Sequence, residues 1–202
     1  MQSLKNEPIE DSRISFQLNY NHFQVEIETE RLFIRSYKSE DFQKYVQLYG
    51  DAAITKYFDH GKPKTKFEVN TLISQKGAAF FIQGKPFGFF SIFNKDGLDF
   101  IGQIDFLPTE EPGVFEIGYI LHEKYHNRGF CTEALKAIII NYTRSINSLG
   151  YFKEFSVLKI MATVHPENLP SKRVLEKMGL SLNKSQERFG KPRLWYSLIL
   201  NF

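Results

Sequence analysis

The sequence contains almost no cysteine and has little excess of either charge. Cys131 is the single cysteine among 202 residues, so no disulfide can form within the chain. This excludes a disulfide-stabilised scaffold and is typical of a protein from a reducing compartment. The 26 Lys and Arg residues are interspersed with 23 Asp and Glu residues, for a formal net charge of +3. Because nucleic-acid-binding proteins usually concentrate basic residues on one face, we expect no direct nucleic-acid partner.

Long apolar runs are also absent. The most apolar stretch, residues 78–93, is interrupted by Gln-Gly-Lys-Pro at residues 83–86, so no segment is long enough to span a bilayer as a helix. The first 13 residues are charged where the core of a signal peptide would be apolar. We therefore expect a soluble, cytoplasmic protein with no membrane partner.

Aromatic residues, in contrast, are abundant. The chain has 20 Phe, 10 Tyr and 1 Trp, and 42% of its residues are hydrophobic, which suits the core of one globular domain. Residues 1–27 are polar and show no strong periodicity, so we interpret them as an N-terminal arm or tail that docks on the body. Residues 28–202 are expected to form the domain.

The spacing of apolar residues in this domain predicts a mixed α and β fold around one sheet. Strands are expected at residues 31–35, 87–94, 100–107, 114–121 and 158–164, with a terminal hairpin within residues 180–202. Helices are expected at residues 39–49, 66–81, 132–148 and 168–178. The order is strand, two helices, three strands, helix, strand, helix and two strands.

One short motif suggests zinc chemistry. Residues 122–126 read H-E-K-Y-H and satisfy H-E-x-x-H, in which both imidazoles must lie on one face of a helix. The segment before it is strand-like, Asn127, Arg128 and Gly129 interrupt a helix, and Thr132 stands where the extended motif requires a third histidine. We therefore expect no metal and keep a zinc hydrolase only as an alternative function.

As a strand, loop and helix, the same stretch predicts an anion site. A strand ends at Leu121, a loop spans residues 126–131, and a helix begins near Thr132. Successive backbone N–H groups ahead of a helix suit a diphosphate, Gly129 allows close approach or a positive φ, and Arg128 adds positive charge. A glycine before a helix is also common in simple turns, so both interpretations stay open at this point.

Seven short segments occur in a consistent order along the chain. They are E-R-L-F-I-R at 30–35, S-E-D-F at 39–42, I-G-Q-I at 101–104, E-I-G-Y at 116–119, Y-H-N-R-G-F-C-T-E-A at 125–134, A-T-V-H-P-E-N-L-P-S at 162–171 and V-L-E-K-M-G at 174–179. Together they resemble the GNAT superfamily of acyl-CoA-dependent N-acetyltransferases. Within it, they resemble the branch of ribosomal-protein alanine and serine N-terminal acetyltransferases. The resemblance covers residues 28–200.

This resemblance implies a GNAT fold of the α/β (α+β) class. Its central sheet would be mixed, mostly antiparallel and twisted, flanked by helices, with a splayed central strand pair. The cosubstrate would be acetyl-CoA, and no metal would be required. In the family, backbone amides of a Q/R-x-x-G-x-G/A loop hold the CoA diphosphate. The corresponding residues here are His126, Gly129 and Cys131, of which only Gly129 matches the consensus.

The resemblance also assigns residues to cofactor binding. Gly118 to Leu121 would separate from the next strand, and the N–H of Ile120 or Leu121 would stabilise the oxyanion. Asn168 would bind the pantetheine arm, although asparagine is equally suited to cap a helix. The full expected set is Tyr119, Ile120, Leu121, His126, Asn127, Arg128, Gly129, Phe130, Cys131, Thr132, Asn168 and Ser171.

Two residues are assigned to catalysis by resemblance. Glu116 would act as the base that removes a proton from the amine, with a salt-bridged structural role as the alternative. Leu175 stands where many GNAT enzymes place a tyrosine acid. In the branch that this chain resembles, the serine of N-x-x-S contacts the CoA sulfur region, which implies that role for Ser171. Cys131 is interpreted as a small buried apolar residue, with a reactive or acylated thiol as the alternative.

The favoured acceptor, again by resemblance, is the α-amine of a protein N-terminus. Polyamines, aminoglycosides and other small amines are the alternatives within the enzyme class. A non-catalytic acyl-CoA-binding module is the alternative outside it. The sequence does not distinguish a monomer from a homodimer.

Overall fold

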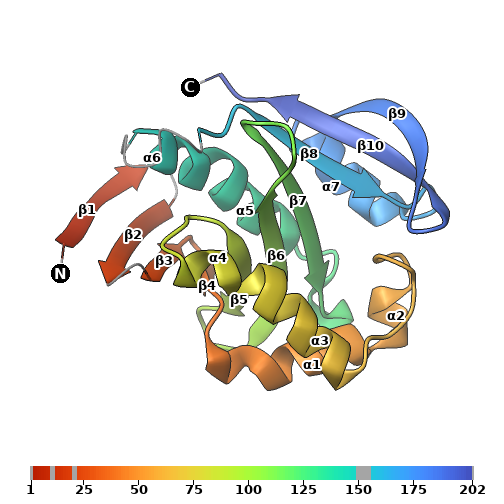
Figure 1. Ribbon diagram of the computed structural model, residues 1–202, viewed down its shortest axis with the longest axis horizontal. Coiled ribbons are helices and arrows are strands. Elements are labelled where there is room, and N and C mark those ends of the chain that lie inside the picture. The colour runs from red at the N-terminus through yellow and green to blue at the C-terminus, as the bar shows by residue number, and fades with distance from the viewer. Residues whose placement is uncertain (1, 10–11, 20–21, 149–155, 202) are drawn as a thin grey trace.

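The computed structural model describes residues 2–9, 12–19, 22–148 and 156–201. These residues form a ten-stranded sheet in the order β1-β2-β3-β4-β5-β6-β7-β8-β10-β9 (Figure 1). The strands are β1 (Gln2–Ile9), β2 (Ser12–Asn19), β3 (His22–Glu28), β4 (Leu32–Ser36), β5 (Gly88–Asn94), β6 (Phe100–Pro108), β7 (Val114–Leu121), β8 (Lys159–Val164), β9 (Ser181–Arg188) and β10 (Lys191–Ile199). Neighbours are antiparallel except for β7 and β8, which are parallel.

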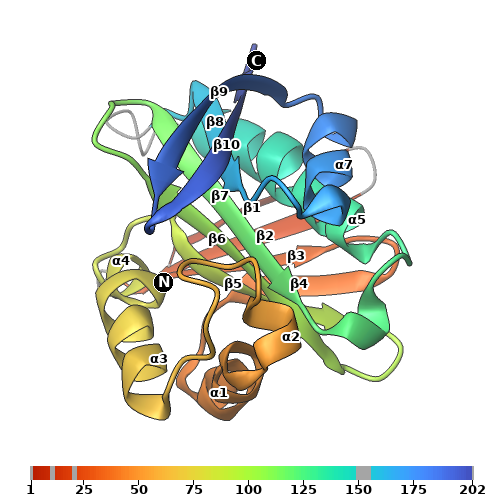
Figure 2. The ribbon, with the colours of Figure 1, turned by 90° about the vertical axis from the view of Figure 1, so that its right-hand side faces the viewer.

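Helices cover both faces of this sheet. They are α1 (Phe42–Gly50), α2 (Ala52–Thr55), α3 (Lys66–Leu72), α4 (Ala79–Ile82), α5 (Phe130–Lys136), α6 (Thr143–Ser148) and α7 (Leu169–Lys177). Figure 2 shows α1 to α4 on one side of the sheet and α5 and α7 on the other. The predicted fold, a mixed and mostly antiparallel sheet flanked by helices, is confirmed.

Each face of the sheet has its own apolar cluster. On one face, Tyr45, Tyr49 and Val69 of the first helices pack on Phe89 and Ile120 of the sheet. The other face buries the long helical segment that runs from α5 through a π-helical turn into α6. Because both faces are covered, the strands between them are almost continuously apolar, as the sequence pattern indicated.

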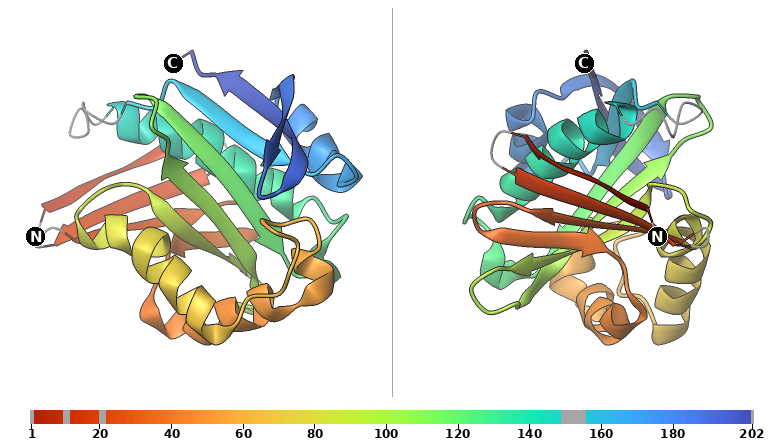
Figure 3. Two further views of the ribbon diagram at one scale, coloured as in Figure 1. Left: turned by 45° about the vertical axis from the view of Figure 1, so that its right-hand side comes forward. Right: turned by 90° about the vertical axis from the view of Figure 1, so that its left-hand side faces the viewer.

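The segment before residue 28 differs from the interpretation as an arm or tail. Its described residues form β1, β2 and β3, and β3 pairs with β4, so the segment extends the main sheet (Figure 3). In β3, Phe23, Val25 and Ile27 alternate with polar residues and are fully buried. This period-two alternation was the available signal for a strand. A domain boundary at residue 28 stays a prediction.

Two further elements begin earlier or are shorter than predicted. The helix expected from Thr132 begins at Phe130, because Gly129 ends the loop in a left-handed conformation with φ of +81°. The helix expected over residues 66–81 is divided into α3, a π-helical turn at Ile73–Gly77, and α4.

The sheet opens at its centre. Parallel pairing between β7 and β8 extends only from Val114–Lys159 to Glu116–Met161, and beyond it the two strands diverge (Figure 3, left). The predicted splayed strand pair is therefore present. Backbone groups of β7 that face this gap lack the partner that a continuous sheet would supply.

Among the described residues, every helix is too short or too polar to cross a bilayer.

Candidate active site

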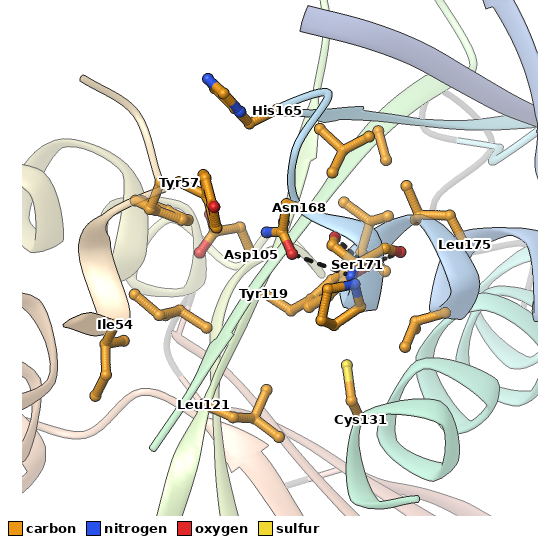
Figure 4. A pocket seen from close by; sticks show the side chains of 18 of the residues that line it. Ile54, Tyr57, Asp105, Tyr119, Leu121, Cys131, His165, Asn168, Ser171 and Leu175 are labelled. Atoms are coloured by element: carbon orange, nitrogen blue, oxygen red, sulfur yellow. Dashed lines mark hydrogen bonds between the residues drawn. The ribbon is translucent and has the colours of Figure 1, made fainter. Parts of the chain in front are cut away.

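A cavity of about 790 Å³ lies where β7 and β8 diverge. Its walls come from β7, β8, the loop before α5, the start of α7 and the segment around α2. Figure 4 shows Tyr119, Cys131 and Ser171 around this space, with Ile54 and Tyr57 across from them. Small-molecule sites typically occupy 300–1,000 Å³, so the cavity is large enough for a sizeable ligand.

The backbone of β7 presents free N–H groups to this gap at alternate residues. His122 N–H donates to Ile101 O, so its backbone faces β6. Successive residues of a strand face opposite neighbours, and Ile120 therefore also faces β6, whereas Tyr119 and Leu121 face the gap. Of the two amides expected to stabilise an oxyanion, Leu121 N–H is the one directed toward the cavity.

The loop that follows is shaped by two left-handed residues and one side chain. Asn127 has φ of +58° and Gly129 has φ of +81°, which places a tight turn directly ahead of α5. The His126 Nε2 atom lies 2.9 Å from Leu121 O, and because a carbonyl only accepts, Nε2 donates. This bond closes the loop against the end of β7 and leaves Leu121 N–H directed at the gap.

The same geometry bears on the zinc motif. Glu123–Tyr125 forms a single 3-10 turn, and His122 lies outside it in an extended conformation. Burial is the main cause that lowers the pKa of His122, with Lys124 adding to it. The motif therefore lacks the α-helix that would place both imidazoles on one face.

A clamp that the sequence analysis missed holds the loop from behind. Arg31 Nε donates to Glu133 Oε2 at 2.7 Å, and Arg31 NH1 donates to Arg128 O at 2.9 Å. Thr29 Oγ1 donates to Glu133 Oε1 at 2.5 Å, and the Arg31 guanidinium lies 4.6 Å from the Phe130 ring centroid. Burial alone would raise the pKa of Glu133, but the hydrogen bonds from Thr29 and Arg31 lower it. The clamp connects β4 to α5.

The start of α7 forms the opposite wall. Asn168 Oδ1 accepts from Ser171 N at 3.2 Å, so Asn168 caps the helix (Figure 4). The Tyr119 hydroxyl lies 2.7 Å from Ser171 Oγ and donates to Ser171 O at 3.1 Å. Burial is the main cause that raises the pKa of Tyr119 well above its usual value. Tyr119 is thus a neutral phenol in contact with Ser171.

Cys131 lines the cavity and packs against the core below it. Burial raises the pKa of its thiol to about 12, so the thiolate is scarce at neutral pH. A neutral thiol is a poor nucleophile. This environment favours the interpretation as a small apolar residue over a reactive thiol.

Glu116 forms an ion pair across the gap. Arg188 NH2 donates to Glu116 Oε2 at 3.0 Å, and Arg188 NH1 also donates to Glu116 Oε1. The same NH1 lies 3.3 Å from Thr163 Oγ1 on β8. The salt-bridged alternative is therefore formed, and the catalytic assignment of Glu116 stays a prediction.

Asp105 is a second acidic residue of the cavity, and the sequence analysis did not select it. It lies on β6, is partly buried, and accepts a hydrogen bond at Oδ1 from Gln103 Nε2, which also donates to the Tyr49 hydroxyl at 2.5 Å. Burial raises the pKa of Asp105 to about 7, and the charges of Asp59 and Glu116 add to this effect. The signal in the sequence was a pair of polar residues inside the apolar strand I-G-Q-I-D-F.

The structure brings nearly all predicted site residues to one cavity. The Arg128 side chain is the exception, because it packs over Phe130 at 5.1 Å from the ring centroid. The predicted residues that line the cavity are Glu116, Tyr119, Ile120, Leu121, His126, Asn127, Gly129, Phe130, Cys131, Thr132, Asn168 and Ser171.

Comparison with known proteins identifies relatives. The family model for the acetyltransferase (GNAT) domain matches residues 31–181. YnaD, an uncharacterized N-acetyltransferase of Bacillus subtilis (strain 168), is 30% identical over 159 residues, which are 77% of this chain and 82% of YnaD.

Solved structures share the fold. A GNAT-family acetyltransferase from Bacillus anthracis has a TM-score of 0.65 at 26% identity, covering 85% of this chain and 96% of its own. The ribosomal-protein-S5-alanine acetyltransferase of Vibrio fischeri has a TM-score of 0.64 at 17% identity, covering 86% of this chain and 96% of its own.

These matches agree with the geometry of the site. The family match includes β7, the loop before α5 and all of α7, which together border the cavity. The free amides of β7 and the tight loop ahead of α5 fit a CoA-type ligand with a diphosphate and an amide-containing arm. The chain belongs to the GNAT family of acetyl-CoA-dependent N-acetyltransferases.

Proposed function

We propose that this protein transfers the acetyl group of acetyl-CoA directly to the α-amine of a protein N-terminus. The observation that carries the proposal is the open gap after Glu116–Met161, which leads into a cavity bordered by a tight loop and a helix start. One surface thus offers backbone donors for a thioester, a loop for a diphosphate and space for an acceptor.

The residues of the chain divide the work of binding. The loop amides that follow His126 would hold a diphosphate ahead of α5, and the Arg31–Glu133 clamp would keep the loop in place. Leu121 N–H would stabilise the oxyanion that forms when the amine attacks the thioester. Asn168 and Ser171 lie where the pantetheine arm would pass.

The reaction also requires two proton transfers. The ammonium of the acceptor must lose a proton before attack, and the departing thiolate must gain one. Ser171 is the candidate near the sulfur, and its contact with Tyr119 supplies a second hydroxyl there. Glu116 and Asp105 are the candidate bases on the cavity wall.

The charges of the cavity favour a monoamine acceptor over a polyamine. A polyamine requires several unpaired carboxylates, but Asp59 pairs with Lys64 at 2.8 Å and Glu116 pairs with Arg188. The Vibrio fischeri structure, which shares the fold at 17% identity, is described as a ribosomal-protein-S5-alanine acetyltransferase, an enzyme with a protein acceptor. A small amine acceptor remains the second candidate, because the named relatives are uncharacterized.

The test is a free-thiol release assay with acetyl-CoA and a matched panel of acceptors. The panel holds peptides with free Ala or Ser N-termini, the same peptides with blocked N-termini, spermidine and an aminoglycoside. We expect release with the free peptides and none with the blocked ones. Preferential release with spermidine or the aminoglycoside would contradict the acceptor assignment.

A thermal-shift titration separates the remaining alternative. A ligand that binds only the folded state must raise the midpoint of unfolding. A rise with acetyl-CoA but no turnover of any amine would indicate a binding module. No rise at millimolar acetyl-CoA would contradict the proposed function as a whole.

A further inference from the structure

The four acidic residues on the cavity wall differ in their surroundings. Asp59 is paired with Lys64, and Glu116 is held at both oxygens by Arg188. Glu123 is exposed on the turn that follows β7. Among the described residues, Asp105 alone of the three inner carboxylates has no cation within ion-pair distance.

The ion pair with Arg188 makes Glu116 a poor candidate for the general base. Arg188 donates one hydrogen bond to each carboxylate oxygen of Glu116, and it also contacts Thr163 on β8. A bidentate guanidinium–carboxylate pair fixes the position and direction of both carboxylate oxygens. Glu116 would have to leave this pair before its oxygens could turn toward an acceptor amine.

Asp105 lies on β6, the direct neighbour of the strand β7 that borders the gap. In the β6–β7 register it is opposite Gly118, and a Cβ at Gly118 would lie 2.7 Å from Asp105 Oδ2. Glycine therefore makes room for the carboxyl group at this point. Leu121, whose N–H faces the gap, lies three residues after Gly118 on β7, or about 10 Å along that strand. That span accommodates an amine and a bridging water.

One hydrogen bond holds Asp105 in this place. Gln103, fully buried, donates from Nε2 to Asp105 Oδ1 and to the Tyr49 hydroxyl on α1. These contacts orient Oδ1 and leave Oδ2, next to Gly118, on the cavity side. In the described part of the chain, no hydrogen-bond donor is recorded for Oδ2.

We infer that Asp105, rather than Glu116, is the general base of this enzyme, an inference that rests on the proposed acetyl transfer. Its carboxylate takes a proton from the acceptor ammonium through a water. The neutral amine then forms the new N–C bond, the C–S bond breaks, and the CoA thiolate takes up a proton. The net products are the acetylated amine, CoA thiol and one proton.

The surroundings of Asp105 make its charge state sensitive to pH near neutrality. Burial raises its pKa to about 7, mainly because the charged form loses water. Carboxylates of neighbouring elements raise this pKa further, whereas the Gln103 amide and a lysine lower it. The groups that act on Asp105 from other elements are Asp59, Glu116 and Lys76, and Tyr49 contacts it through Gln103.

The test compares the pH dependence of kcat in three proteins: the wild type, Asp105→Asn and Glu116→Gln. We use kcat with a saturating Ala-peptide because the free α-amine itself titrates near pH 8 and would appear in kcat/KM. The wild type should show a rising limb centred near pH 7. Asp105→Asn should lose about 100-fold or more of kcat at pH 7.5 and lose that limb. Glu116→Gln should keep the limb but move it to lower pH, because it removes a charge that raises the pKa of Asp105.

Two further measurements serve as controls, one for folding of the variant and one for assignment of the limb to Asp105. Asp105→Asn should retain the acetyl-CoA-dependent rise in the unfolding midpoint, which shows that the donor site is intact. Asp59→Asn removes a charge that raises the pKa of Asp105, so the limb should move to lower pH while the plateau of kcat is kept.

The outcomes are distinct. A limb that persists in Asp105→Asn and disappears in Glu116→Gln would overturn the inference and restore Glu116 as the base. A limb that Asp59→Asn leaves unmoved would also contradict it. If the wild type binds acetyl-CoA but acetylates no amine, the proposed function fails, and the inference fails with it.

Discussion

At the scale of single residues, burial decides the chemistry of the cavity. Asp105 and Cys131 both lose water on folding, and in both the neutral form is favoured. For a carboxyl this moves the titration toward neutral pH, where a base is useful. For a thiol it moves the titration away from neutral pH and suppresses reactivity. The same physical cause thus supports one residue as a participant and the other as packing.

Asp105 should reduce stability as the pH rises. The folded protein keeps this proton up to about pH 7, whereas the unfolded chain releases it near pH 4. Between these values the folded state binds more protons, so the free energy of unfolding falls with increasing pH. Relative to the wild type, Asp105→Asn should raise the free energy of unfolding by about 1 to 3 kcal/mol at pH 8.

Urea unfolding at pH 4.5 and pH 8 measures this effect. The difference in the free energy of unfolding between Asp105→Asn and the wild type should be much smaller at pH 4.5, where Asp105 is neutral in the folded protein. An equal difference at both pH values would mean that Asp105 titrates normally. Asp99→Asn, an acidic residue for which no cavity contact is recorded, serves as the control for loss of one negative charge.

Cys131 should react slowly with thiol reagents in the native protein. A pKa of about 12 leaves far less thiolate at pH 8 than a solvated cysteine has. We expect modification by a chromogenic disulfide to be at least 100-fold slower in native protein than in urea. Rapid stoichiometric labelling of the native protein would restore the reactive-thiol interpretation.

At the scale of elements, the loop before α5 depends on a strand far away in the sequence. Arg31, directly before β4, binds Glu133 in α5 and the carbonyl of Arg128 in the loop. The loop is therefore held by a side chain that does not line the cavity. Arg31 is a positioning residue in this sense.

Arg31→Ala should weaken acetyl-CoA binding more than it lowers stability. Loss of the clamp frees the loop, and a charge-assisted hydrogen bond contributes about 1.5 to 3 kcal/mol, which corresponds to roughly 10-fold or more in Kd. Isothermal titration with CoA measures this, with Arg13→Ala, an exposed arginine of β2, as the matched control. An unchanged Kd in Arg31→Ala would show that the loop keeps its shape without the clamp.

At the scale of the whole molecule, the site exists because one strand pair separates. The sheet is continuous from β1 to β7 and again from β8 to β9, and the cavity opens between the two parts. Arg188 of β9 reaches across this opening to Glu116 of β7. Helices cover both faces of the sheet (Figure 2).

Much of the fold after residue 28 was predictable because local patterns set it. Short apolar runs identified the strands, and Asn168 marked the start of α7. The sequence analysis missed β3. Phe23, Val25 and Ile27 alternate with polar residues there, but the segment before residue 28 is polar as a whole and was interpreted as a tail. The division into α3, a π-helical turn and α4 has no local signal in the apolar spacing.

The sequence by itself determined the family, the loop around Gly129 and one part of the cavity wall, because these are carried by short contiguous segments. Only the tertiary structure decided which acidic group is paired, since Glu116 and Arg188 are 72 positions apart. It likewise placed Asp105 over Gly118 and connected Arg31 to Glu133. The physical reason is that pKa and hydrogen bonding depend on neighbours in space, which strand register and packing bring together.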